Sequence, residues 1–199
     1  MFEKYLNNKF ITIYLLPFII GSLTILSFHP FNITIINLLI FPLFFYLITY
    51  INKKSKSKYR KKPFRKNLFL FGLFFGLGFY TSGISWISNS LTFDDNFKFL
   101  IPFALIIIPL FLSLFMSIPT VLVGPYLKFD FSSVIIFSAS LAFSDYLRAK
   151  ILTGFPWNLW AYSTTWLTEI LQIINLTGFY TYNLFTITVF VLPIILFFK

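Results

Sequence analysis

The chain has 199 residues, of which 58% are hydrophobic, 23% aromatic and only 11% charged, and its mean hydropathy is +0.84. A soluble domain usually carries about 25% charged residues, so this composition excludes a water-soluble globular protein. Nine of the sixteen basic residues lie between Lys53 and Lys66, so the net charge of +10 belongs to one loop and we expect no nucleic-acid partner. The sequence has no cysteine, which excludes disulfides and thiolate chemistry within it, and we expect no metal and no cofactor.

Six apolar segments predict an all-α fold, a polytopic bundle of transmembrane helices. The expected spans cover residues 10–28, 33–51, 68–87, 99–126, 131–147 and 178–198. About 20 apolar residues are enough for a helix to cross about 30 Å of hydrocarbon. We expect one transmembrane domain over 1–199, with an interfacial arm at 148–166 and an amphipathic segment at 167–177.

The basic loop at 53–66 has two interpretations. It binds anionic headgroups or nucleic acid, or it marks the cytoplasmic side, because short loops rich in lysine and arginine stay inside. The second interpretation predicts that both termini are cytoplasmic. The outer side then receives His29, the acidic loop of Asp94 and Asp95, and the arm.

The third apolar segment carries a small-xxx-small pair, Gly72 and Gly76. Such a pair lets another helix pack closely. The end of this segment becomes polar and contains Trp86, a residue type that favours the boundary between lipid and water.

The arm gathers charge, helix-breaking residues and aromatic rings directly after a long apolar run. The sequence from Asp145, at the end of the preceding span, to Tyr162 in the arm reads DYLRAKILTGFPWNLWAY. Gly154 and Pro156 within it stop a regular helix. Trp157, Trp160 and Tyr162 carry rings that favour the membrane boundary. Such a segment either anchors a helix end or handles a lipid at the interface.

Arg148 and Lys150 are basic residues on the side of the membrane where they are least expected. Asp145 can pair with Arg148 or with Lys150, which follow it by one helical turn or slightly more. Either basic residue can instead meet a lipid phosphate. The planar guanidinium of Arg148 suits the oxygens of such a phosphate. Both alternatives remain open from the sequence.

The arm resembles a known signature. LRAKILTGFPWNLWAYS at 147–163 is similar to the LRG-x-x-LTGFPW-x-x-x-GYS signature of bacterial apolipoprotein N-acyltransferases. LSFHPF at 26–31, GLFFGLGFYTSGISWISNSL at 72–91 and LTGFYTYNLF at 176–185 resemble further parts of that family in order and spacing. Ala149 and Ala161 depart from the pattern, because the family has glycine at both places.

The resemblance implies an enzyme that transfers an acyl chain from a membrane phospholipid to the N-terminal amine of a diacylglyceryl-cysteine lipoprotein. The reaction passes through a cysteine thioester in a nitrilase-like domain of the same chain. It also implies the bacterial cytoplasmic (inner) membrane, with the arm facing the periplasm. We expect this chain to bind and orient lipid but to lack the catalytic domain, and therefore to be inactive alone; no catalytic residue is predicted.

By the same resemblance, six residues are candidates for contact with lipid, and three shape the arm. The lipid-binding candidates are Arg148, Lys150, Phe155, Trp157, Tyr162 and Trp86. The structural residues of the arm are Asp145, Gly154 and Pro156.

Two other functions compete with this interpretation. A small transporter subunit would usually bury ionisable residues at the middle of the bilayer, whereas the charges here collect at the ends of the spans. An inactive lipid-binding remnant would share the fold and differ only in activity.

Overall fold

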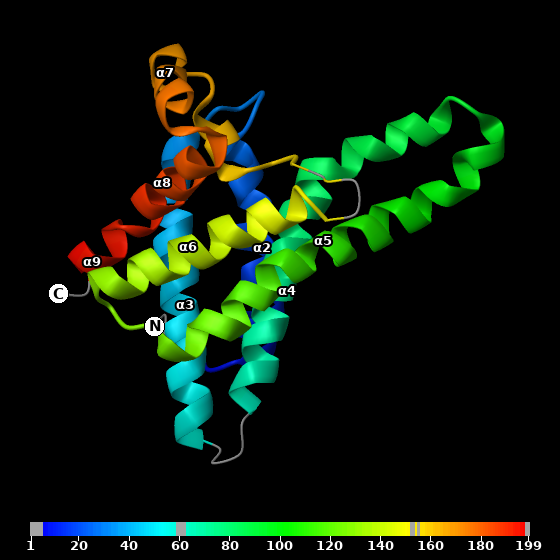
Figure 1. Cartoon of the computed structure of the whole chain (residues 1–199). Coiled ribbons are helices and arrows are strands. Elements are labelled where there is room, and N and C mark those ends of the chain that lie inside the picture. Colours follow the sequence, from blue (N-terminus) through cyan, green and yellow to red (C-terminus); the bar gives the residue numbers. More distant parts are fainter. Residues whose placement is uncertain (1–5, 59–62, 152–153, 155, 198–199) are drawn as a thin grey trace.

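The computed structural model describes residues 6–58, 63–151, 154 and 156–197. Within these ranges every regular element is helical, which confirms the predicted all-α class (Figure 1). The first element, η1, is a π-helical turn, and the other η elements are 3₁₀ helices. In chain order the elements are η1 (Ile11–Leu15), α2 (Leu16–Leu23), η2 (Thr24–Ser27), η3 (Thr34–Ile36), α3 (Asn37–Lys58), α4 (Pro63–Ile84), η4 (Ser85–Thr92), η5 (Asp95–Leu100), α5 (Ile101–Val123), η6 (Gly124–Tyr126), α6 (Phe131–Arg148), η7 (Trp160–Thr164), α7 (Thr168–Thr177), α8 (Phe179–Val191) and α9 (Pro193–Phe197).

Four helical stretches of the described chain are long and apolar enough to cross a membrane. They are Thr34–Ser55, Arg65–Thr92, Asp95–Tyr126 and Phe179–Phe197, and each overlaps a predicted span. Ile11–Ser27 forms a shorter apolar helix, and α6 is less apolar because it carries five serines, Asp145 and Arg148. The count of six spans and the cytoplasmic position of the two termini therefore stay predictions.

Helix α4 packs closely against α5 through the predicted glycine pair. A Cβ built on Gly72 would lie 2.8 Å from the Cα of Ser117, and one on Gly76 would lie 2.7 Å from the Cα of Ser113. On another face of α4, a Cβ on Gly78 would overlap the backbone of α2. The close helix packing expected at Gly72 and Gly76 is confirmed, and α4 contacts both α5 and α2 through its glycines.

The core between the helices is aromatic. Phe44 of α3 stacks on Phe75 of α4 with ring centroids 4.0 Å apart, and Phe137 of α6 packs against the same ring of Phe44 at 5.8 Å. These three side chains are fully buried. A core of flat rings lets α3, α4 and α6 bury large apolar area, although three serines of α6, Ser133, Ser138 and Ser144, are buried as well.

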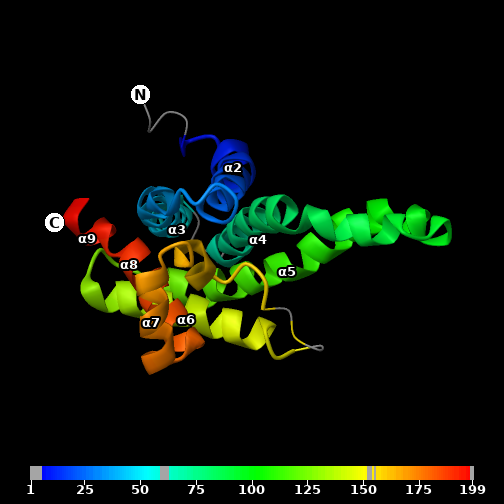
Figure 2. The same cartoon turned by 90° about the horizontal axis from the view of Figure 1, so that it is seen from above.

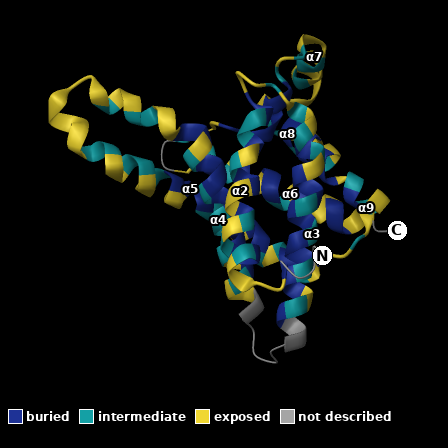
Figure 3. Cartoon of the chain, turned by 180° about the vertical axis from the view of Figure 1, so that it is seen from behind, coloured by how far each residue is buried: buried dark blue, intermediate teal, exposed yellow. Residues whose placement is uncertain are grey.

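Two parts of the chain extend away from the bundle. The hairpin of η4 and η5, continued by the first turns of α5, projects sideways in two views at right angles (Figures 1 and 2). Most of its surface is exposed, and Phe93 at its tip region is 91% exposed (Figure 3). Helix α7 has no buried residue, and Glu169, Gln172 and Asn175 on it are all exposed.

Candidate functional site: the arm and its aromatic pocket

The arm begins where α6 ends. Helix α6 closes at Arg148, and the amide of Ala149 still donates to the carbonyl of Asp145 at 3.0 Å. Gly154 then adopts φ +77°, and a Cβ there would overlap the carbonyl oxygen of Ala149. Because only glycine fits this left-handed position without strain, Gly154 turns the chain back toward the bundle. Pro156 is exposed on the segment of the arm that leads back to the bundle.

Asp145 and Arg148 form a buried ion pair at the base of the arm. Arg148 Nη2 lies 3.2 Å from Asp145 Oδ1, and both side chains are 1% exposed. Arg148 Nη1 also donates to the backbone carbonyl of Trp157 at 2.7 Å. The guanidinium carbon lies 5.3 Å from the centre of the Tyr80 ring, within the range of a cation–π contact. Arg148 thus connects α6, α4 and the arm.

Asn183 of α8 completes this network. Its Nδ2 donates to Asp145 Oδ2 at 3.0 Å, and its Oδ1 accepts from the backbone amide of Ala161 at 2.9 Å. Asn183 is fully buried. We did not single it out from the sequence, although a lone amide in an apolar span was a usable signal, because buried polar groups need partners.

Trp160 is enclosed in the protein interior, so its ring is not offered to lipid or water as the sequence led us to expect. It is 0% exposed, and its ring stacks on Phe79 with centroids 4.5 Å apart and an interplanar angle of 16°. Phe41 meets it edge-on at 4.7 Å. The turn η7 directs this ring into the bundle, where three elements enclose it.

Trp157 and Trp86 instead line an open pocket of about 630 Å³. The turn between η2 and η3, the end of α4, the start of η4 and the arm form its walls. The two indoles are 49% and 48% exposed, and their ring centroids lie 5.2 Å apart. Phe28 and Ile25 contribute apolar surface to the same pocket.

The structure therefore brings together three of the predicted lipid-binding residues. Tyr162 joins Trp86 and Trp157 in the pocket, and its ring packs against Phe179 at 4.8 Å. Burial raises the pKa of the Tyr162 hydroxyl, so this group is a neutral phenol at physiological pH.

The other predicted residues lie elsewhere. Arg148 is turned toward Asp145, which is the arrangement that the ion-pair alternative describes. Lys150 is exposed, with its Nζ 5.9 Å from the ring centre of Tyr146. Phe155 lies outside the described residues. A role in lipid binding stays a prediction for all of these positions.

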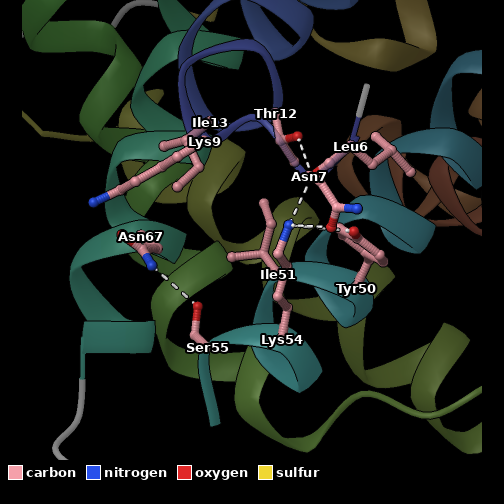
Figure 4. Close-up of a pocket in the computed structure, with 10 residues that line it drawn as sticks. All are labelled: Leu6, Asn7, Lys9, Thr12, Ile13, Tyr50, Ile51, Lys54, Ser55 and Asn67. Carbon is pink, nitrogen blue, oxygen red and sulfur yellow. Dashed lines mark hydrogen bonds between the residues drawn. The ribbon is translucent and has the colours of Figure 1, made fainter. Parts of the chain in front are cut away.

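A second, smaller pocket of about 230 Å³ lies near the opposite end of α4 (Figure 4). Lys54 Nζ donates to the carbonyl of Leu6 and to Asn7 Oδ1, each at 3.0 Å. Asn67 Nδ2 donates to Ser55 Oγ at 3.0 Å. These bonds join the N-terminal segment to α3 and α3 to α4.

The described chain is thus a helical bundle with four stretches long and apolar enough to cross a membrane and with an aromatic pocket at the end of α4. The family model for the apolipoprotein N-acyltransferase N-terminal domain matches residues 20–192. The chain belongs to this family.

Relatives of the same description cover most of this chain. An apolipoprotein N-acyltransferase of Rhodopseudomonas palustris is 30% identical over 177 residues, which are 88% of this chain and 32% of the relative. One of Bradyrhizobium diazoefficiens is 31% identical over 174 residues, 87% of this chain and 31% of the relative. One of Brucella melitensis is 28% identical over 185 residues, 92% of this chain and 34% of the relative. The chain spans about one third of the length of these curated relatives.

Proposed function

We propose that this chain is the membrane domain of an apolipoprotein N-acyltransferase and that it holds the phospholipid acyl donor in the pocket of Trp86, Trp157 and Tyr162. In this proposal the whole enzyme passes the acyl chain to the N-terminal amine of a diacylglyceryl-cysteine lipoprotein. The observation that best supports this proposal is the pocket itself. The segment 147–163, which resembles the family signature, forms one of its walls through Trp157, Asn158 and Tyr162. Its indoles are half exposed beside the apolar side chains of Ile25 and Phe28, a setting suited to lipid tails.

The contribution of such a pocket is positioning. A lipid held at one place meets its reaction partner at a high effective concentration, which lowers the entropic part of the barrier. The buried network of Asp145, Arg148 and Asn183 supports this role, because it fixes the arm to two helices. A pocket wall fixed in this way keeps its shape when a flexible lipid binds.

The chemical step belongs to the nitrilase-like domain that the family resemblance implies. The sequence given has no cysteine, so no residue of it forms the thioester. We expect the chain by itself to bind phospholipid and to transfer no acyl group. A lipid-binding remnant would behave in the same way in isolation, and only acyl transfer by the whole gene product separates the two.

Fluorescence quenching tests the binding part of the proposal. The purified chain in detergent micelles is titrated with a phospholipid that carries bromine atoms on its acyl chains. We expect saturable quenching of tryptophan emission, and we expect Trp157→Ala to weaken the apparent affinity about fivefold, equivalent to ~1 kcal/mol of lost contact.

Trp166→Ala is the matched control. Trp166 is about as exposed as Trp157, but it lies outside the pocket and donates from Nε1 to Thr34 Oγ1 at 2.8 Å. The control keeps the wild-type affinity. Equal affinities in all three proteins contradict the proposed site, and solute flux through proteoliposomes supports the transporter alternative instead.

Single-cysteine labelling tests the proposed periplasmic position of the arm. The sequence offers no cysteine background, so Thr165→Cys on the arm and Lys128→Cys in the loop before α6 each give one reactive thiol. In intact cells a membrane-impermeant maleimide is expected to label the first and not the second. The reverse pattern contradicts the proposed orientation.

A further inference from the structure

Asn158 is a polar group of the pocket for which the fold provides no partner. Its side chain is 7% exposed and lines the pocket beside Trp157. Its Nδ2 is buried and has no hydrogen-bond partner among the residues that the structure describes. A buried amide hydrogen without an acceptor is destabilising, and the rarity of such groups in native proteins means that each one needs an explanation.

The backbone at Asn158 and a neighbouring glycine both fit this side chain. Asn158 has φ +52°, a left-handed conformation that asparagine tolerates better than most residues. A Cβ on Gly83 would overlap Asn158 Nδ2, so the absence of a side chain at Gly83 leaves room for the amide. The torsion between Cβ and Cγ of asparagine is broad, so the amide can turn from Gly83 toward the cavity.

The surroundings indicate the chemistry of the missing acceptor. Among the described residues, those that line the pocket include neither lysine nor arginine. His29 is the one side chain of the described pocket lining that can carry a positive charge. A phosphate would therefore lack the arginine or lysine that commonly holds it in proteins. A neutral carbonyl oxygen instead needs only one neutral donor. Of the polar groups among the described lining residues, Asn158 Nδ2 is the buried one that lacks a partner. In a phospholipid, the ester carbonyls lie between the headgroup and the tails, beside the apolar chains that the indoles suit.

We propose that the Asn158 amide donates a hydrogen bond from Nδ2 to an ester carbonyl oxygen of a bound diacyl phospholipid. The bond fixes the depth at which the lipid sits, with its tails against Phe28 and Trp157. This inference rests on the proposed function of the pocket. It adds that Asn158 Nδ2 is the atom by which the pocket distinguishes an ester-linked lipid from an ether-linked one.

The test compares two lipids that differ only at the linkage. The purified chain is titrated with a diacyl phospholipid and with the matching di-O-alkyl phospholipid, which has the same headgroup and brominated chains but no carbonyl. We expect the wild-type protein to bind the diacyl lipid about 3- to 10-fold more tightly, the range of one ordinary hydrogen bond. In Asn158→Leu the preference is expected to fall to about 1 while the affinity for the ether lipid is kept.

Two further variants separate chemistry from folding. Gly83→Ala keeps the amide but displaces it, so it too is expected to reduce the ester preference. This variant provides the test if Asn158→Leu fails to fold. Asn67→Leu removes an amide in the pocket of Figure 4. Asn67 lies on α4 about 24 Å from Gly83, at a rise of about 1.5 Å per residue. This control keeps the wild-type preference.

The outcomes are distinguishable. If both lipids bind the wild-type protein equally well, or if Asn158→Leu and Gly83→Ala keep the ester preference, this inference is overturned while the lipid-binding proposal stands. If neither lipid quenches the pocket tryptophans, both are overturned.

Discussion

Replacing Asn183 by leucine tests whether a polar network fixes the arm to the bundle. The substitution keeps the branching and the number of heavy atoms of the side chain, although leucine is larger, and it removes an amide that donates to Asp145 and accepts from Ala161. It also leaves the Ala161 amide hydrogen and one oxygen of Asp145 buried without that partner. We therefore expect Asn183→Leu to lower the free energy of unfolding by more than the replacement of an exposed polar residue by an apolar one would.

The size of the loss follows from the two bonds. The bond to the Asp145 carboxylate measures 3.0 Å and the bond from the Ala161 amide measures 2.9 Å. A hydrogen bond to a charged group contributes about 1.5–3 kcal/mol and a neutral one about 0.5–1.5 kcal/mol. Bonds between membrane helices average about 0.6 kcal/mol and reach about 1.7 kcal/mol. The range that satisfies both sets of values is about 2–3 kcal/mol for Asn183→Leu.

Reversible unfolding in mixed micelles measures this value. Trp160 is a suitable probe, because its ring is fully buried and stacked on Phe79 in the folded state. Thr188→Val on the same helix is the matched control. The Thr188 hydroxyl donates to the carbonyl of Leu184 one turn earlier, a bond within the helix itself, so we expect a change within about 0.5 kcal/mol. An Asn183→Leu protein as stable as this control would refute the reasoning.

Three further substitutions follow from the same structure and use the same reversible unfolding, which is followed by far-ultraviolet circular dichroism for the variant that replaces Trp160. Arg148→Met leaves Asp145 as a buried charge and is expected to cost about 3–5 kcal/mol, whereas exposed Lys150→Met changes stability by less than about 0.5 kcal/mol; equal effects would contradict the buried pair. Trp160→Ala removes a fully enclosed ring and is expected to cost about 3–5 kcal/mol, clearly more than Trp86→Ala at the half-exposed pocket wall. Gly76→Leu inserts a side chain where α4 meets α5 and is expected to cost at least about 1–3 kcal/mol; a neutral result would show that the two helices can move apart.

The sequence predicts the helical class and part of the site because these depend on local patterns. Long apolar runs with charges at their ends indicate spans without knowledge of the packing. Gly72 and Gly76 indicate a close helix contact because only small residues permit it. The TGFPW segment has a family signature, so Trp157 and Tyr162 could be named before the pocket was seen.

The parts that escaped prediction depend on long-range geometry. Asn183 bonds to a carboxylate 38 positions earlier in the chain, and a single amide in an apolar helix carries no periodic signal. Trp157 and Trp160 are similar in sequence, yet one ring faces the pocket and the other faces the core. An irregular segment has no repeating direction for its side chains, so sequence spacing alone cannot assign their sides. Asn158 was missed for the same reason.

The central claim is that phospholipid occupies the pocket of Trp86, Trp157 and Tyr162. Photo-crosslinking in nanodiscs, with a phospholipid that carries a photoactivatable group next to its ester, tests this claim most directly when the adducts are mapped by mass spectrometry. We expect adducts concentrated in the peptides that contain Trp86 and residues 157–165. Adducts confined to the projecting hairpin around Phe93, with none at the pocket, would contradict it.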